Sequence, residues 1–472
     1  MNVELLLAPV FLPLVAALLA AICGAAAGRW LTLLTSVALL ATLARLTVVI
    51  ANGPLEYALA DVAVPLGIRL VLDDLGLLML WLVGIVYAAT GVHARTSIGA
   101  GRAAGRFWPV WLLMQAALNA LFLSADLFNI YVVLEIASLC GIALISYEMK
   151  AEALRAAMRY LLLALLASLL YLLGVAVIYG ATGALDIAIA GARLDGGIAT
   201  IAALGLITGG LLLKSAIFPL HGWLPPANGS APAPVSAVLS ALLVKASLYL
   251  LYRTWFWMPV PLDLAAAGQL LAALGAGALV YGSILALRQE RLKSVVAYST
   301  VAQLGYLMLV FALPGAWSGT VYHLLSHGLA KAAMFLAAGN MVWVLGSDRL
   351  DHLPGVDRHL PISTLAFALA AVSLMGLPPS GGFLAKWILL SAAWNAGAWG
   401  WVVLLAAGSL LAAAYLFRVL VIAFSPASAP QAPQPRRPPH RGMEVSALAL
   451  ALVAIAAGFT AAPVLDRLST PP

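Results

Sequence analysis

The sequence predicts an all-α integral membrane protein with about fourteen transmembrane helices, and three observations lead to this prediction. Of the 472 residues, 64% are hydrophobic and only 9% are charged, whereas about a quarter of the residues in a soluble domain are charged. Apolar runs long enough to cross a bilayer, which takes about 20 residues, recur along the whole chain. Basic residues gather in alternate loops between these runs. A chain of this composition cannot cover a water-facing surface, which excludes soluble proteins.

The predicted spans are separated mostly by short loops. Their approximate limits are 5–22, 30–51, 73–92, 107–123, 127–147, 158–180, 198–217, 235–253, 264–287, 294–313, 317–345, 363–390, 398–424 and 444–462. No basic residue precedes the first span, so we expect a retained helix rather than a cleaved signal peptide. Little sequence follows the last span, so we expect no long C-terminal amphipathic helix. Tryptophans near span ends, such as Trp108, Trp111, Trp255 and Trp257, predict an interfacial aromatic belt.

The loop charges predict the orientation of the chain. Loops after odd-numbered spans hold most of the loop lysines and arginines. The other loops and the C-terminal tail hold only Arg69, Arg193, Arg253 and Arg467. Because basic loops stay in the cytoplasm, we expect a multi-pass protein of the cell (plasma) membrane with both termini outside the cytoplasm. Topology explains the net charge of +7, so we expect no nucleic-acid partner.

Two predicted spans contain helix-breaking residues beside a lysine. These residues are Pro219, Pro225 and Pro226 near Lys214, and Pro378, Pro379, Gly381 and Gly382 before Lys386. Paired interrupted helices are typical of inverted-repeat transporters. We therefore expect two or more broken helices and two inverted five-helix repeats. The predicted domains are 1–106 (three helices), 107–253 and 254–424 (the repeats), 425–443 (a proline-rich cytoplasmic linker) and 444–472 (last helix and tail).

Five charged residues lie within apolar runs, away from any loop: Glu135, Lys214, Lys245, Lys331 and Lys386. A charge at bilayer depth costs about 3 kcal/mol on insertion scales, so it must face the bundle interior, pair, or line a wet path. Burial disfavours the charged form of a lysine, and a nearby carboxylate restores it. Moving a carboxylate therefore switches a lysine between holding and releasing a proton. The pattern indicates a proton relay; the alternative is a set of static ion pairs.

Two histidines extend this pattern. His323, His327 and Lys331 are spaced by four residues, which places them on one helix face. Histidine titrates near physiological pH, so we expect the two histidines to bridge lysines in the relay. A metal site is the alternative, but no third ligand is apparent and Lys331 would repel a cation. A buried histidine can also serve only as a hydrogen-bonding group.

Cofactor motifs are absent from the sequence. It contains two cysteines, Cys23 and Cys140, and no CxxC pair. It also contains no phosphate-binding loop, HExxH motif or dinucleotide fingerprint. We therefore expect no nucleotide, metal or redox cofactor.

At these motifs the chain resembles the antiporter-like proton-translocating subunits of multisubunit cation/proton (Mrp-type) antiporters and of respiratory complex I. The resemblance covers nearly all of the chain and is strongest in FNIYVVLE, KSAIFPLHGWLPPANGSAPAPVSAVLSALLVK, RLKSVVAYSTVAQLGY, HLLSHGLAKAAMF and PPSGGFLAKW. It implies fourteen helices, two inverted repeats and a polar axis along the membrane midplane. By this likeness, the family's glutamate falls on Glu135, its broken-helix lysine on Lys214, its connecting lysine on Lys245, its central histidine and lysine on His327 and Lys331, and its terminal charge on Lys386.

Within this family, a lysine at position 386 resembles the antiporter D-type members, whereas the HGWLP–PVSA block resembles complex I and membrane-bound hydrogenase subunits equally. We expect a proton-translocating subunit of a multisubunit monovalent cation/proton antiporter, without catalysis of its own. Its expected partners are other membrane subunits, the lipid bilayer, protons, and Na⁺ or K⁺. The alternatives are a proton-pumping subunit of complex I (NADH:quinone oxidoreductase) or of a hydrogenase, an anion-holding solute transporter, and an inert scaffold.

Overall fold

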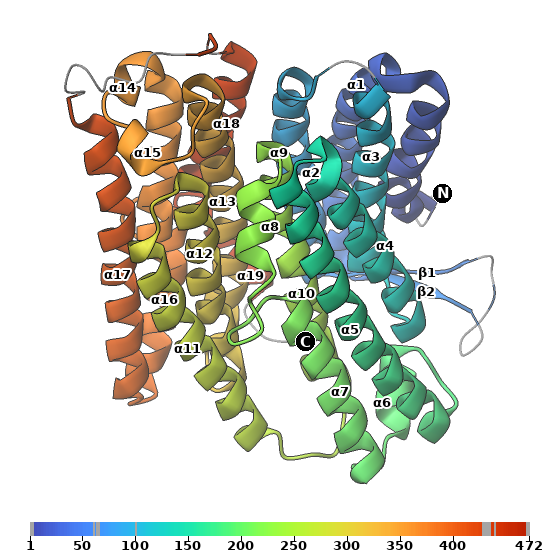
Figure 1. Cartoon of the computed structure of the whole chain (residues 1–472). Helices are drawn as coiled ribbons and strands as arrows, with labels where there is room; N and C mark the ends of the chain where they lie inside the picture. Colours follow the sequence, from blue (N-terminus) through green and yellow to red (C-terminus); the bar gives the residue numbers. More distant parts are fainter. Residues whose placement is uncertain are drawn as a thin grey trace.

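The computed structural model describes residues 4–59, 62, 67–99, 102–426, 436–438 and 440–468. Long helices lie side by side and run between two opposite ends of the molecule (Figure 1). Within these residues, nine helices are long and apolar enough to cross a membrane, and shorter apolar helices accompany them. The predicted class, an all-α membrane protein, is confirmed. The number of fourteen spans stays a prediction.

The N-terminal part comprises α1 (Ala8–Val49), α2 (Asp74–Ser97) and α3 (Arg102–Leu123). The first two predicted spans are the two halves of α1, which changes direction at Gly24, where the positive φ of 82° suits glycine. Between α1 and α2, the strands β1 (Leu55–Ala58) and β2 (Arg69–Leu72) form an antiparallel hairpin at one side of the bundle (Figure 1).

The next helices are α4 (Leu127–Ile145), α5 (Ala151–Thr182), α6 (Ile187–Arg193), α7 (Ile198–Lys214), α8 (Leu224–Ser230), α9 (Ala233–Val238) and α10 (Val244–Phe256). The seventh predicted span therefore breaks at Lys214, and the short α8 follows the break. A one-turn π-helix, Leu239–Leu243, joins α9 to α10 in one buried span.

The remaining helices are α11 (Ala265–Arg288), α12 (Leu292–Leu304), α13 (Trp317–Leu345), α14 (Val356–His359), α15 (Pro361–Met375), α16 (Gly381–Asn395), α17 (Trp399–Phe424), α18 (Arg441–Ala456) and α19 (Ala462–Arg467). A 3₁₀ segment, Gly305–Phe311, follows α12. The twelfth predicted span is two half-helices, α15 and α16. Most of the predicted linker 425–443 lies outside the described residues, and α18 begins near its end.

The two helix breaks share one backbone pattern. Directly beyond the last turns of α7 and α15, Ala216 and Gly376 adopt left-handed conformations with φ of 55° and 81°. The next amide turns back in both places: Ile217 N donates to Leu212 O at 3.2 Å, and Leu377 N donates to Val372 O at 3.0 Å. This is a common helix-ending geometry, which satisfies some of the terminal carbonyls.

A second backbone pattern also occurs twice. The start of α4 is tied to the segment after α5, where Leu127 N donates to Leu185 O at 2.8 Å. The start of α12 is tied in the same way to the segment after α13, where Leu292 N donates to Asp348 O at 2.7 Å. The first tie lies beside the β-hairpin, since Leu70 of β2 pairs with Ser124 just before α4, and the second lies at the end of the bundle with α14 (Figure 1).

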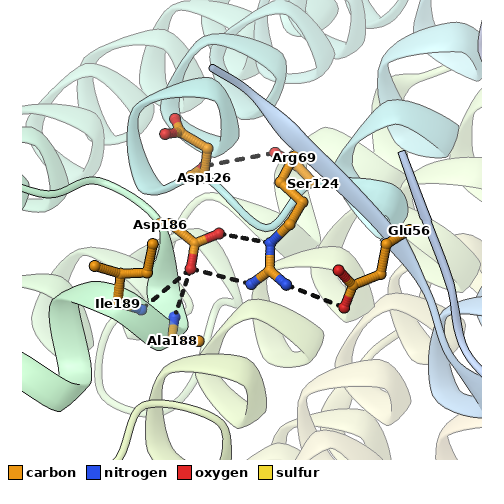
Figure 2. A network of polar contacts seen from close by, with 7 residues as sticks. All are labelled: Glu56, Arg69, Ser124, Asp126, Asp186, Ala188 and Ile189. Atoms are coloured by element: carbon orange, nitrogen blue, oxygen red, sulfur yellow. Dashed lines mark hydrogen bonds and ion pairs between the residues drawn. The ribbon is translucent and has the colours of Figure 1, made fainter. Parts of the chain in front are cut away.

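The β-hairpin is fastened to the bundle by Arg69 (Figure 2). Its Nε and Nη2 donate to the Asp186 carboxylate at 2.8 and 3.0 Å, and its Nη1 donates to Glu56 at 3.0 Å. Asp186 also accepts the N–H groups of Ala188 and Ile189 and so caps α6. Burial lowers the pKa of Arg69. The hydrogen bonds to Asp186 and the negative charge of Asp186 have the opposite effect, and the pKa of Arg69 is raised overall.

The predicted aromatic belt is wrong for two tryptophans. Trp108 and Trp111 are fully buried, because α1 and α2 pack over this end of α3. The ring of Trp111 lies 4.9 Å from that of Tyr87, centroid to centroid. Trp255 and Trp257 are only partly buried at the end of α10, as the belt requires.

Candidate functional site: a row of buried charges

Glu135 on α4 and Lys214 at the end of α7 form an ion pair, with 3.3 Å between Oε2 and Nζ. Each member of the pair also forms a hydrogen bond with a serine hydroxyl. Lys214 Nζ donates to Ser138 Oγ at 2.9 Å, and Ser168 Oγ on α5 donates to Glu135. Lys214 can therefore keep a hydrogen bond to Ser138, and Glu135 one to Ser168, if the ion pair opens.

Glu135 lies on the exposed face of α4. Phe128, Val132 and Leu139 occupy the same helical face by their spacing and are 46%, 37% and 47% exposed. The Glu135 side chain is 18% exposed, whereas that of Lys214 is only 3% exposed. The carboxylate therefore stands at the boundary between the bundle interior and an apolar outer surface.

Lys245 lies two residues after the π-helical turn, and its Nζ reaches back to the carbonyl of Ser240. Single π-turns often mark functional positions. The side chain is fully buried. Within the part of the chain that the structure describes, no carboxylate lies within ion-pair distance of it.

Lys331 on α13 is also fully buried, and its Nζ donates to Val296 O on α12. Thr300 Oγ1 donates to the same carbonyl at 3.2 Å and lies 2.9 Å from Ser240 Oγ. Because Ser240 O also accepts Lys245 Nζ, a continuous series of hydrogen-bonding residues joins Lys245 to Lys331. Sequence reasoning predicted both lysines but not this link.

His323 and His327 continue the row along α13. Their rings stack with centroids 5.5 Å apart and an angle of 2° between the planes. Both are buried, and their ring nitrogens have no hydrogen-bond partner among the described residues. The described part of the chain contains no group of three His, Cys, Asp or Glu residues arranged to hold a metal ion.

Lys386 on α16 lies beyond the histidines. Its Nζ donates to Leu374 O at 2.7 Å and contacts Met375 O at 3.4 Å, at the end of α15. It also stands 4.6 Å above the ring of Tyr306, whose centroid is 5.2 Å from that of His323. Lys386 is therefore linked to the histidines through an aromatic ring.

In the described structure no hydrogen bond joins Lys214 to Lys245, and none joins Lys331 to the histidines. All seven predicted residues lie on helices that pack in one bundle. Contacts through Ser240 and Thr300 join Lys245 to Lys331, and Tyr306 joins His323 to Lys386. Lys331, His327 and His323 are related by their four-residue spacing on one face of α13.

Sequence reasoning missed several polar residues of the row: Ser138, Ser168, Ser240, Ser299, Thr300 and Tyr306. Ser138 had a signal, since it lies three residues after Glu135 and so shares its helical face. Ser299 accepts a hydrogen bond from Lys331 at 2.8 Å. Ser299 and Thr300 are adjacent hydroxyl residues in the middle of a membrane span, which was also a signal. The partners of Ser168 and Ser240 depend on helix packing, which spacing alone does not give.

Comparison with known proteins shows the family of this chain. Residues 124–412 match the family described as NADH:quinone oxidoreductase/Mrp antiporter, TM. The chain is 39% identical over 405 residues to the N subunit of the NADH-quinone oxidoreductase of Desulforudis audaxviator (82% of this chain, 78% of the relative). It is 28% identical over 383 residues to the D subunit of the Na(+)/H(+) antiporter of Bacillus subtilis (80% and 77%).

Among solved structures, a chain of the Mrp complex from Dietzia sp. DQ12-45-1b superimposes with a TM-score of 0.90 at 26% identity, over 99% of this chain and 96% of that chain. The likeness extends to the fold as a whole, and the family match spans the helices that carry Glu135, the lysines and the histidines. The chain belongs to the NADH:quinone oxidoreductase/Mrp antiporter transmembrane family.

Proposed function

We propose that this chain is the proton-translocating subunit of a multisubunit monovalent cation/proton antiporter. Its protons move along the row formed by Glu135, Lys214, Lys245, His323, His327, Lys331 and Lys386. The observation that carries the proposal is the row from Lys245 through Lys331 and the histidines to Lys386, which consists of fully or nearly fully buried titratable groups. Groups of this kind are costly in a membrane and mark ion pathways.

The ion pair between Glu135 and Lys214 supplies the switch. A buried lysine holds its proton while a carboxylate is near and releases it when the carboxylate moves away. Ser168 and Ser138 hold the separated partners. Protons enter near Lys214 and leave near Lys386, or travel the reverse way.

One observation favours a second candidate function, a proton-pumping subunit of an NADH:quinone oxidoreductase. The relative from Desulforudis audaxviator, which bears that name, is 39% identical to this chain, against 28% for the Bacillus subtilis antiporter protein. Purifying the native complex separates the two. Only the second candidate has redox subunits that co-purify and NADH-driven pumping.

A solute transporter that holds an anion is disfavoured. Such a site needs several cations that converge on one point. Here Lys245, Lys331 and Lys386 donate to carbonyls of different residues on different helices, namely Ser240, Val296 and Leu374. The lysines are strung out along the bundle, as a relay requires.

We place the chain among other membrane subunits of a cell-membrane complex. The exposed apolar face of α4 around Glu135 suits a neighbouring subunit that covers the carboxylate. The loop charges support a cytoplasmic 425–443 linker and termini outside. The two backbone patterns that occur twice, at the helix breaks and at the starts of α4 and α12, support 107–253 and 254–424 as inverted repeats.

The test uses the assembled complex in inverted membrane vesicles, with collapse of an imposed pH gradient as the measurement. Lys245→Met and Lys331→Met should each abolish cation-dependent proton movement. Lys150→Met is the matched control, because the Lys150 side chain is 70% exposed and pairs with Glu148 at the surface. Normal proton movement in both buried-lysine variants would refute the relay.

A further inference from the structure

The C-terminal end of the half-helix α15 presents carbonyl groups toward Lys386. Gly376, in its left-handed conformation, ends the helix, so the carbonyls of Leu374 and Met375 face the Lys386 ammonium at 2.7 and 3.4 Å. The end of a helix dipole adds partial negative charge here. Among the described residues, no carboxylate lies within ion-pair distance of Lys386. Backbone oxygens therefore hold this charge.

A buried hydroxyl group lies at the same contact between α15 and α16. Ser373 Oγ is buried, and within the described chain it has no hydrogen-bond partner. It lies against Gly382, where an added Cβ would come 3.0 Å from the oxygen. Gly382 precedes Lys386 by four residues and shares its face of α16. Leaving a buried polar atom without a partner is unfavourable, so Ser373 is suited to a ligand that the helices do not supply.

An aromatic ring completes the surroundings. The face of Tyr306 lies 4.6 Å from Lys386 Nζ, which is a cation–π distance. The ring is fixed because Tyr306 OH donates to Leu405 O at 3.3 Å. The titratable groups that face this region are His323 and His327 on α13, Tyr306 itself and Tyr415 on α17. None of them is negatively charged near neutral pH.

We propose that the carbonyls of Leu374 and Met375, together with Ser373 Oγ, bind a dehydrated monovalent cation, Na⁺ or K⁺, in exchange for the Lys386 ammonium. Backbone carbonyls replace the hydration shell of such ions in channels, and C-terminal ends of broken helices coordinate them in transporters. This inference rests on the proposed function and gives the transported cation a place in it.

The exchange conserves charge at the site. Lys386 passes its proton towards His323, the neutral amine moves off the carbonyls, and one cation takes its place. When a proton returns to Lys386, the ammonium reclaims the carbonyls and expels the cation. The site holds one positive charge in either state, so proton and cation binding exclude each other there.

The first test measures competition in proteoliposomes that contain the assembled complex. Transport is followed against pH at a series of Na⁺ and of K⁺ concentrations. Because one site binds either ion, each tenfold rise in saturating cation should move the pH midpoint down by about one unit. A pH midpoint that does not change with the concentration of either cation would overturn the proposal.

The second test changes the ligands. Ser373→Ala should raise the KM for the cation about tenfold or more, since a hydrogen-bonding oxygen to a charge contributes about 1.5–3 kcal/mol, while kcat at saturating cation stays near wild type. Ser391→Ala, on α16 beside the outer cleft near Trp387, is the control and should change neither. An unchanged KM in Ser373→Ala would overturn the cation site.

Lys386→Met separates this inference from the proposed function. The variant removes the competing ammonium but keeps the carbonyls, so equilibrium binding of ²²Na⁺ or ⁸⁶Rb⁺ to the purified complex should become independent of pH. Co-purification of the other subunits shows that the variant assembles. If Lys386→Met stops proton transport but binds no cation, the result supports the proton relay and refutes the cation site. If the variant transports protons normally, the proposed function is refuted.

Discussion

Trp223 and Lys386 occupy matching positions at the two helix breaks. Nε1 of Trp223 donates to Leu213 O at 2.9 Å, and Nζ of Lys386 donates to Leu374 O at 2.7 Å. Each carbonyl belongs to the last residue but one of its half-helix, and each donor follows the break and turns back to it. An indole N–H does not titrate. Of the two breaks, therefore, only the second is closed by a group that can lose a proton.

Trp223→Phe should destabilise the first break. The ring stacks on Tyr160 with centroids 4.2 Å apart, and phenylalanine keeps much of this contact but loses the donor to Leu213 O. A buried acceptor left without its donor costs about 1–3 kcal/mol, so thermal unfolding of the purified complex should shift to lower temperature. Trp394→Phe, at a position 59% exposed, should leave the transition unchanged; an equal shift in both would contradict this account.

Lys214→Ala should abolish proton-coupled transport while the complex still assembles, because alanine removes the titrating group and fits a helix. Glu135→Gln should do nearly the same, since it removes the charge that controls the lysine. Ser138→Ala removes only the second partner of Lys214 and should reduce the rate about tenfold or less. Vesicle pH-gradient assays measure all three, and full activity of Lys214→Ala would exclude a role in the relay.

Thr300→Val should interrupt the hydrogen-bonded series between Lys245 and Lys331. Valine keeps the shape of the side chain but removes the hydroxyl that contacts Ser240 and Val296. Proton transport should fall about tenfold, which corresponds to about 1.4 kcal/mol. Thr254→Val is the control, because the Thr254 hydroxyl donates only within its own helix. Equal activity in both variants would show that protons do not pass this link.

Cysteine labelling tests the orientation. In a background without Cys23 and Cys140, cysteines at Ser425 and Thr460 should react with an impermeant maleimide from opposite sides of the membrane. Ser425 directly follows α17 at the start of the predicted cytoplasmic linker, and Thr460 is exposed beyond the far end of α18. Reaction of both from the same side would show that the predicted topology is wrong.

The isolated chain should not exchange ions efficiently on its own. The partly exposed Glu135 suits a neighbouring subunit that covers its carboxylate. Purified protein in liposomes should therefore fail to collapse an imposed pH gradient on addition of Na⁺ or K⁺. Robust exchange that disappears with Lys214→Ala would identify a self-sufficient antiporter instead.

The sequence was sufficient to predict the helical membrane fold and the buried charges, because a lysine inside an apolar run is easily recognised from the sequence alone. It could not predict the acceptors of those lysines. Val296 and Leu374 hold Lys331 and Lys386 through backbone carbonyls, for which residue type carries no signal. The same limit explains Trp108, whose position near a span end gave no sign that α1 and α2 cover it.

The partial exposure of Glu135 also bears on how the protein is made. A newly inserted copy presents this carboxylate on an apolar helix face, and a charge in the hydrocarbon costs about 3 kcal/mol. Contact with a neighbour that covers α4 removes this cost, so the free energy of the orphan copy is higher than that of the incorporated one. The residue that we propose to control Lys214 therefore also favours contact with a neighbouring subunit, and we expect unincorporated copies to be less stable than incorporated ones.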